Sequence, residues 1–71
     1  MTQEQLDNWF TYHAPENDFQ MEGYKNIRTA GKALAETIVK YCPASADATA
    51  AVRKVREAIM TANAAIACKG K

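Results

Sequence analysis

Two runs of evenly spaced apolar and small residues constrain the fold of this chain more than any other feature. In each run, residues recur at alternating intervals of three and four, the spacing of the a and d positions of a helical seam. The first run is Tyr24, Ile27, Gly31, Leu34, Ile38 and Tyr41, and the second is Ala48, Val52, Val55, Ile59, Ala62 and Ile66. They predict two amphipathic helices, over about residues 21–41 and 46–68.

The segment Cys42-Pro43-Ala44-Ser45 separates the two runs. Proline disfavours helical geometry in the residue before it, so the first long helix is expected to end at Tyr41. Ser45 is a good N-cap, and Asp47 suits the first turn of the helix that follows. Two seams of equal length joined by a short turn predict an antiparallel helical hairpin.

The N-terminal part of the chain predicts one more, shorter helix. Thr2 and Gln5 fit a capping box, which indicates a helix over about residues 3–10. Residues 11–20 are interpreted as a loop. The expected fold class is therefore all-α, a short N-terminal helix plus a long antiparallel helical hairpin, in one domain of residues 1–71.

Two helices cannot enclose a core, and a chain of 71 residues buries a limited fraction of its surface. Both long helices also carry small residues away from the seam, which permit close approach between subunits or simply reflect helix propensity. These residues are Ala30, Ala33, Ala35, Ala51, Ala58 and Ala65. We therefore expect the hairpin to assemble as a compact homo-oligomer.

Composition narrows the classes of function. A formal net charge of +1 argues against a general binder of DNA or RNA polymers. No run of about 18 apolar residues predicts a membrane span, and residues 1–5 lack the basic and apolar regions of a signal peptide. Cys42 and Cys68 are expected at opposite ends of the hairpin, too far apart for a disulfide, which favours reduced thiols in a cytoplasmic protein.

The sequence does not predict an enzyme. His13 is the only histidine, and no serine or cysteine near it in sequence completes an obvious catalytic set. His13, Cys42 and Cys68 lack the spacing of zinc ligands, and no glycine-rich phosphate loop is present. We expect no catalytic residue, no cofactor and no metal.

A basic stripe is the first candidate site. Lys25, Arg28 and Lys32 are spaced i, i+3, i+7 and share one helical face near the expected helix start, where they oppose the macrodipole. Arg28 can bind a phosphate through two hydrogen bonds, and Thr29 can add a neutral one. The alternative is a solvated stripe neutralised by neighbouring acids, namely Glu22 and Glu36.

Tyr12 and His13 precede this stripe. An aromatic ring beside an anion site can stack on a flat group, so the combination favours a nucleotide ligand. The alternatives are that the Tyr12 ring packs on the hairpin and that His13 is merely exposed to solvent. Asn63 lies among small residues of the last helix. One interpretation is that its side chain faces a subunit contact or a pocket, and the alternative is that it is exposed to solvent.

An ordered set of segments resembles a known family. The segments are Phe10-Thr11-Tyr12-His13, Tyr24 to Ala35, Cys42-Pro43 and Arg56 to Ala67. In order and spacing they resemble the phage anti-CBASS cyclic-oligonucleotide sponges, whose hairpin domain is shared with the Thoeris anti-defence sponges.

This resemblance implies a helical homo-oligomer, typically a hexamer, in the host cell cytoplasm. Such proteins bind cyclic dinucleotides, and in many members also cyclic trinucleotides at separate sites, without cleaving them. The host effector is thereby deprived of its signal. By position, the resemblance assigns base stacking to Tyr12 and phosphate binding to Arg28. It makes Lys25, Thr29 and Lys32 their neighbours and extends the site to His13.

The chain departs from its relatives at two positions. Relatives often have two prolines after the Tyr-His pair, where this chain has Ala14 before Pro15, and some have an aromatic residue where it has Thr61. The first departure affects loop rigidity, and the second bears on the trinucleotide site or an oligomer contact. Two alternative functions remain open, a sponge for cyclic ADP-ribose isomers and a helical-hairpin inhibitor that docks on a host protein.

Overall fold

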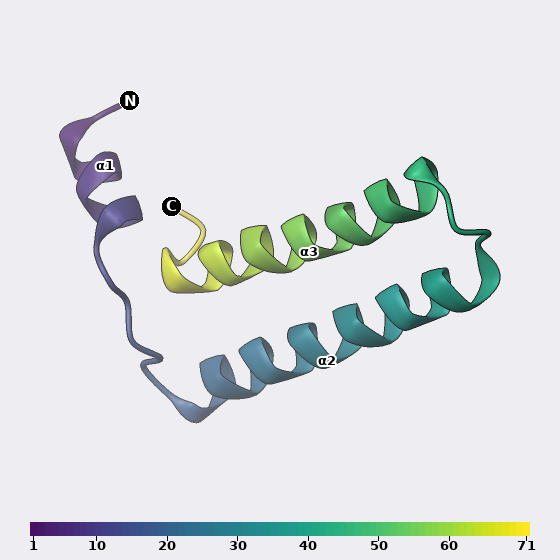
Figure 1. Cartoon of the computed structure of the whole chain (residues 1–71). Coiled ribbons are helices and arrows are strands. Elements are labelled where there is room, and N and C mark those ends of the chain that lie inside the picture. The colour runs from purple at the N-terminus through teal and green to yellow at the C-terminus, as the bar shows by residue number, and fades with distance from the viewer.

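The computed structural model describes residues 1–71 as three α-helices without a β-strand (Figure 1). Helix α1 spans Gln3–Phe10, α2 spans Asp18–Tyr41 and α3 spans Ala46–Ala67. Helices α2 and α3 run antiparallel and side by side, while α1 lies at the open end of the hairpin, next to the C-terminus (Figure 1). The predicted all-α class and the helical hairpin are confirmed.

The caps explain where the helices begin. Thr2 forms the predicted capping box, because its Oγ1 accepts from the Gln5 amide at 3.1 Å and its own amide donates to Gln5 Oε1 at 3.2 Å. The Ser45 hydroxyl accepts from the Ala48 amide at 3.2 Å and starts α3. Each cap satisfies amide groups that the first turn of a helix leaves without a partner.

Helix α2 begins at Asp18, not near Met21 as the sequence analysis predicts. Asn17 is the N-cap, with its Oδ1 accepting from the Gln20 amide at 2.9 Å, and Asp18 places a favourable acid in the first turn. Lys25 therefore lies roughly two turns inside the helix. The interpretation that the basic stripe opposes the macrodipole at the helix start is wrong, since that effect fades within the first turn.

The seam between α2 and α3 differs from the predicted heptad pattern at two positions. Leu34 and Tyr41 are exposed, by 52% and 73%, whereas Ala35 is half-buried. A straight helix has 3.6 residues per turn and drifts away from a strict seven-residue repeat. The seam of α2 therefore passes from Gly31 to Ala35 and then Ile38, which places one alanine interpreted as off-seam within the hairpin contact.

Gly31 marks the closest approach of the two long helices. A Cβ atom at this position would lie 2.7 Å from Ile59 Cγ1 and closer still to Cδ1, so the Ile59 side chain occupies the space that a larger residue would need. Gly23 faces Ile66 less tightly, with a corresponding distance of 3.4 Å to its Cδ1. These two contacts fix the register of α2 against α3.

A tight turn follows α3 and connects it to α1. The Gly70 amide donates to Ala65 O at 2.9 Å and the Lys69 amide to Ile66 O at 3.2 Å, with Lys69 in the left-handed region at φ 56°. This is the hydrogen-bond pattern of a Schellman motif. The turn brings the main-chain oxygen of Lys71 to Trp9, whose Nε1 donates to it at 3.3 Å.

The chain by itself is a thin, elongated slab. Its extents are 44 × 30 × 15 Å, and its radius of gyration is 15.1 Å against about 11 Å for a compact chain of this length. None of the 71 residues is fully buried. No helix combines the length and the apolar character needed to cross a bilayer. Both cysteines are free thiols.

Candidate ligand-binding site

Tyr12 lies in the segment between α1 and α2, residues 11–17, here called the arm. Its side chain is 85% exposed. The alternative in which the ring packs on the hairpin is therefore wrong for the single chain. An exposed tyrosine ring offers one or both faces to a planar ligand.

The two residues beside Tyr12 are engaged with the end of α1. Thr11 Oγ1 donates to Asp7 O at 2.5 Å. His13 is half-buried, and its Nε2 lies 2.6 Å from Asn8 O, which can only accept. His13 is therefore not the freely exposed histidine of the sequence-based alternative, and one of its ring nitrogens is already engaged with the main chain.

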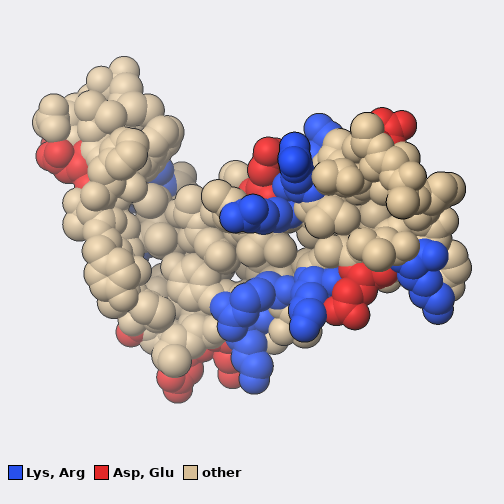
Figure 2. Space-filling view, viewed as in Figure 1, with Lys and Arg blue, Asp and Glu red and all other residues tan.

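The basic stripe lies on α2 and is free of acidic partners. Lys25, Arg28, Thr29 and Lys32 are all exposed. The one ion pair of the chain joins Lys69 to Glu16 at 3.0 Å, so the neutralising pairs with Glu22 and Glu36 do not form. Figure 2 shows basic side chains over the middle of the hairpin, on both long helices, with acidic side chains beside them. The stripe therefore carries cations without ion-pair partners, which are available to an anionic ligand.

The hairpin places two residues of α3 on the same edge as Arg28. Arg28 lies four residues after Tyr24 and three before Gly31, so it flanks the seam. Arg56 and Asn63 flank the seam of α3 in the same way. Each lies four residues after one seam residue and three residues before the next. In antiparallel right-handed helices, equal offsets lie on the same edge. We call Arg28, Arg56 and Asn63 the basic edge of the hairpin.

Asn63 stands out on this edge. It is half-buried, and its Oδ1 is fully covered and accepts no hydrogen bond. A covered amide oxygen without a donor costs about 1–3 kcal/mol. The sequence analysis singles out Asn63 but does not name Arg56 as a candidate site residue. Arg56 was missed because its position beside Arg28 follows only from the register of the two helices.

The opposite edge of the hairpin is an apolar groove. It has a volume of about 530 Å³ and is lined mainly by small and aliphatic side chains from both long helices. The lining residues are Ile27, Ala30, Gly31, Leu34, Lys54, Val55, Ala58, Ile59 and Ala62. The hairpin thus has two unlike edges, one basic and one apolar.

The structure does not bring Tyr12 and Arg28 together within one chain. From Asp18 to Arg28 the helix rises by about 15 Å, while the arm leads from Asp18 in the direction of α1 (Figure 1). Neither the apolar groove nor the three other hollows with a known lining contain either residue. Tyr12 and Arg28 therefore lie in separate parts of the single chain.

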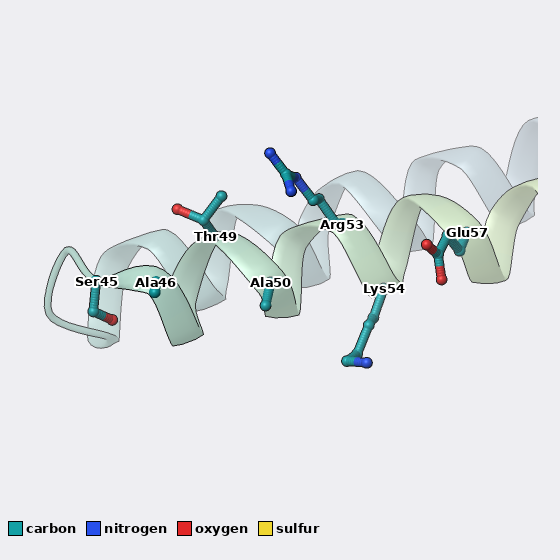
Figure 3. Close-up of a pocket in the computed structure, with 7 residues that line it drawn as sticks. All are labelled: Ser45, Ala46, Thr49, Ala50, Arg53, Lys54 and Glu57. Atoms are coloured by element: carbon teal, nitrogen blue, oxygen red, sulfur yellow. The ribbon is translucent and has the colours of Figure 1, made fainter.

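Other hollows lie elsewhere on the chain. One of about 550 Å³ separates α1 from the outer face of α3, is lined by Trp9, Phe10 and Cys68 among others, and is open in Figure 2. Another lies along the first half of α3 (Figure 3), where Arg53 and Lys54 point away from each other and do not converge on a ligand. No cluster of His, Cys, Asp and Glu could hold a metal ion.

Nearly the whole chain matches the sequence model of one known family. Residues 2–67 match the family model of the Acb2/Tad1 hairpin domain. No curated protein and no solved structure matches the chain. The matched range contains the arm, both long helices and the basic edge. The chain therefore belongs to the Acb2/Tad1 hairpin-domain family, which is the sponge family for cyclic nucleotide signals that its sequence resembles.

Proposed function

We propose that this protein binds and sequesters cyclic oligonucleotide second messengers without cleaving them, with cyclic dinucleotides as its first ligand class and cyclic trinucleotides as a second class to be tested. Sequestration in the host cell cytoplasm would keep the signal from CBASS effectors. The observation that carries this proposal is the family match over residues 2–67. It is supported by two features of the site, the exposed Tyr12 ring and the exposed, unpaired Arg28.

The proposed contacts follow from the chemistry of the ligand. A cyclic dinucleotide has two bases, which stack on aromatic rings, and two phosphates, which bind guanidinium groups through paired hydrogen bonds. One chain offers Tyr12 and Arg28 at separate places. Two chains related by a two-fold axis would offer two rings and two guanidinium groups, the same symmetry as the ligand. Lys25, Thr29 and Lys32 lie beside Arg28 as secondary contacts. His13 flanks Tyr12, and its Nε2 is engaged with Asn8 O.

The exposed area supports assembly into a homo-oligomer, for which the family resemblance implies a hexamer. The single chain exposes 5911 Å², whereas a compact monomer of 7.8 kDa exposes about 4,400 Å². The excess of about 1,500 Å² exceeds the roughly 800 Å² that one partner buries in a standard interface. We propose that second copies cover the apolar groove and leave the basic edge to the ligand.

Isothermal titration of the full chain against a panel of cyclic dinucleotides, cyclic trinucleotides and cyclic ADP-ribose isomers tests the proposal. We expect micromolar or tighter binding of at least one cyclic oligonucleotide. Binding of cyclic ADP-ribose isomers alone would replace it with the alternative sponge activity. If no member of the panel binds, both sponge activities are ruled out.

The fate of the bound ligand separates a sponge from an enzyme. After incubation with excess protein and heat denaturation, the released ligand is analysed by liquid chromatography. The expected result is intact cyclic ligand in full yield. Recovery of a linear product, reproduced with a second preparation and absent without protein, would show that the protein is a hydrolase.

The apolar groove also favours the second candidate, docking on a host protein. The groove presents aliphatic side chains to solvent in the single chain, with Leu34 52% exposed. If the protein proves monomeric in solution and binds no cyclic nucleotide, a host partner becomes the better occupant. Affinity capture with the wild-type chain and a groove variant in parallel would then identify a partner that depends on the groove.

A further inference from the structure

The residues on both sides of Tyr12 cap the end of α1. The last carbonyl groups of a helix have no partner within the helix. Here two of them accept from side chains of the arm, Asp7 O from Thr11 Oγ1 at 2.5 Å and Asn8 O from His13 Nε2 at 2.6 Å. The arm is thus attached to α1 immediately before and immediately after Tyr12.

This arrangement directs the Tyr12 ring outward. Thr11 is extended, with φ −98° and ψ 142°, and in an extended segment the side chains of residues i and i+2 lie on one side. Thr11 and His13 both turn toward the last turn of α1, so the side chain between them turns away from it. The 85% exposure of Tyr12 agrees with this geometry.

Three more contacts connect this unit to the hairpin. The main-chain oxygen of Lys71 accepts from Trp9 Nε1 at 3.3 Å, and Asn8 O also lies 3.8 Å from Cys68 Sγ. At the other end of the arm, Glu16 pairs with Lys69 at 3.0 Å. The position of Tyr12 relative to α3 is therefore set by residues on either side of it and not by its own ring.

We infer that Thr11 and His13 are positioning residues, which hold the Tyr12 main chain so that the ring is presented to a base before the ligand arrives. This inference rests on the proposed function for its effect on affinity. It assigns His13 a role through the main-chain oxygen of Asn8 and not through the ligand. Preorganisation of this kind strengthens binding because less conformational freedom is lost in the complex.

Matched pairs of variants test the inference. Thr11→Val keeps the shape of the side chain and removes the hydroxyl, whereas Thr11→Ser keeps the hydroxyl. His13→Ala removes the donor, whereas His13→Gln retains an N–H donor on a side chain of similar reach. We expect Thr11→Val and His13→Ala each to weaken ligand binding by about two- to tenfold, the worth of one hydrogen bond, and the conservative variants to restore it.

A double-mutant cycle distinguishes positioning from direct contact. In a Tyr12→Ala background, neither Thr11→Val nor His13→Ala should weaken binding further, because the ring that they position is gone. An undiminished effect of His13→Ala in that background would show that His13 contacts the ligand itself and would overturn its role as a positioning residue.

A measurement without ligand keeps the inference independent of the proposed function. Fluorotyrosine incorporated at position 12 alone reports the mobility of this ring by ¹⁹F NMR in the free protein. Thr11→Val and His13→Ala should narrow its resonance and shift it toward the value of the unfolded chain, and Thr11→Ser should not. An unchanged resonance in both disruptive variants would overturn the inference even if the protein binds cyclic nucleotides.

Discussion

Tyr12 and Arg28 reach their proposed roles in different ways. Tyr12 is available because its neighbours engage the end of α1 and leave the ring 85% exposed. Arg28 is available because no acidic side chain pairs with it. The position of Tyr12 depends on the arm, whereas the position of Arg28 depends on α2. The contributions of the two residues to binding can therefore be separated by mutation.

Substitution of these residues should weaken binding without disturbing assembly. We expect Tyr12→Ala to cost about 1–3 kcal/mol through lost stacking and Arg28→Ala about 1.5–3 kcal/mol through lost phosphate contacts, measured by isothermal titration. Tyr41 and Lys40 offer a matched aromatic and cation, since the Lys40 Nζ lies 5.2 Å from the Tyr41 ring at the far end of α2. Tyr41→Ala and Lys40→Ala should leave affinity unchanged. Equal affinities for all four variants and the wild type would place the site elsewhere.

The pairing of α2 with α3 depends on glycine at one point of the seam. Gly31 is half-buried, and the Ile59 side chain fills the place where a Cβ atom would lie. Glycine is about 1 kcal/mol worse than alanine in an unstrained helix, so intrinsic propensity alone would favour substitution. Overpacking of a tight contact costs about 1–3 kcal/mol and should outweigh that gain here.

Alanine at the two seam glycines should therefore act with opposite signs. Gly31→Ala is expected to lower the free energy of unfolding by up to about 2 kcal/mol, since the clash exceeds the gain in propensity. Gly23→Ala should raise it by up to about 1 kcal/mol, because a Cβ there makes an ordinary contact 3.4 Å from Ile66 Cδ1. Urea denaturation at a fixed protein concentration measures both. Gly31→Ala combined with Ile59→Val should recover part of the loss; a Gly31→Ala protein as stable as Gly23→Ala would refute the tight contact.

The whole chain lacks an enclosed core. Its stability therefore depends on how much of its exposed apolar surface becomes covered. The chain is 15 Å thick in its smallest dimension, close to a single layer of helix, and exposes more area than a compact monomer of its mass. Its two edges differ in chemistry, so the proposed assembly through the apolar groove and the proposed ligand binding at the basic edge would use different residues.

A charge placed in the apolar groove should dissociate the proposed oligomer. Leu34→Lys puts an ammonium group where a second copy would exclude water, which carries a large desolvation penalty. Sedimentation at low micromolar concentration should show the wild type at a multiple of 7.8 kDa and the variant near the mass of one chain. Thr49→Lys adds the same charge on α3 outside the apolar groove (Thr49 is labelled in Figure 3) and should leave the mass unchanged. A wild-type chain that sediments as a monomer, or an unaffected Leu34→Lys assembly, would contradict this mode of assembly.

The sequence by itself determined the helices and the turn between the long ones, because these follow from chemistry among near neighbours. The capping box of Thr2, the proline after Cys42 and the cap at Ser45 each act over a few residues. The earlier start of α2 was also encoded locally, in Asn17, but the same residue type is common in loops. The chemistry of a side chain is known without the fold, so the sequence was enough to name the candidate residues Tyr12, Lys25, Arg28, Thr29 and Lys32.

Only the tertiary structure decided how these elements meet. It placed Ala35 and not Leu34 in the seam, brought Arg56 and Asn63 to the edge that carries Arg28, and engaged His13 with the end of α1. The physical reason is that helix register and end contacts depend on side chains far apart in sequence, such as Gly31 with Ile59 and Trp9 with Lys71. A periodic pattern predicts which face of a helix is buried, but only to within a fraction of a turn. An error of that size is enough to exchange a seam residue for an exposed one.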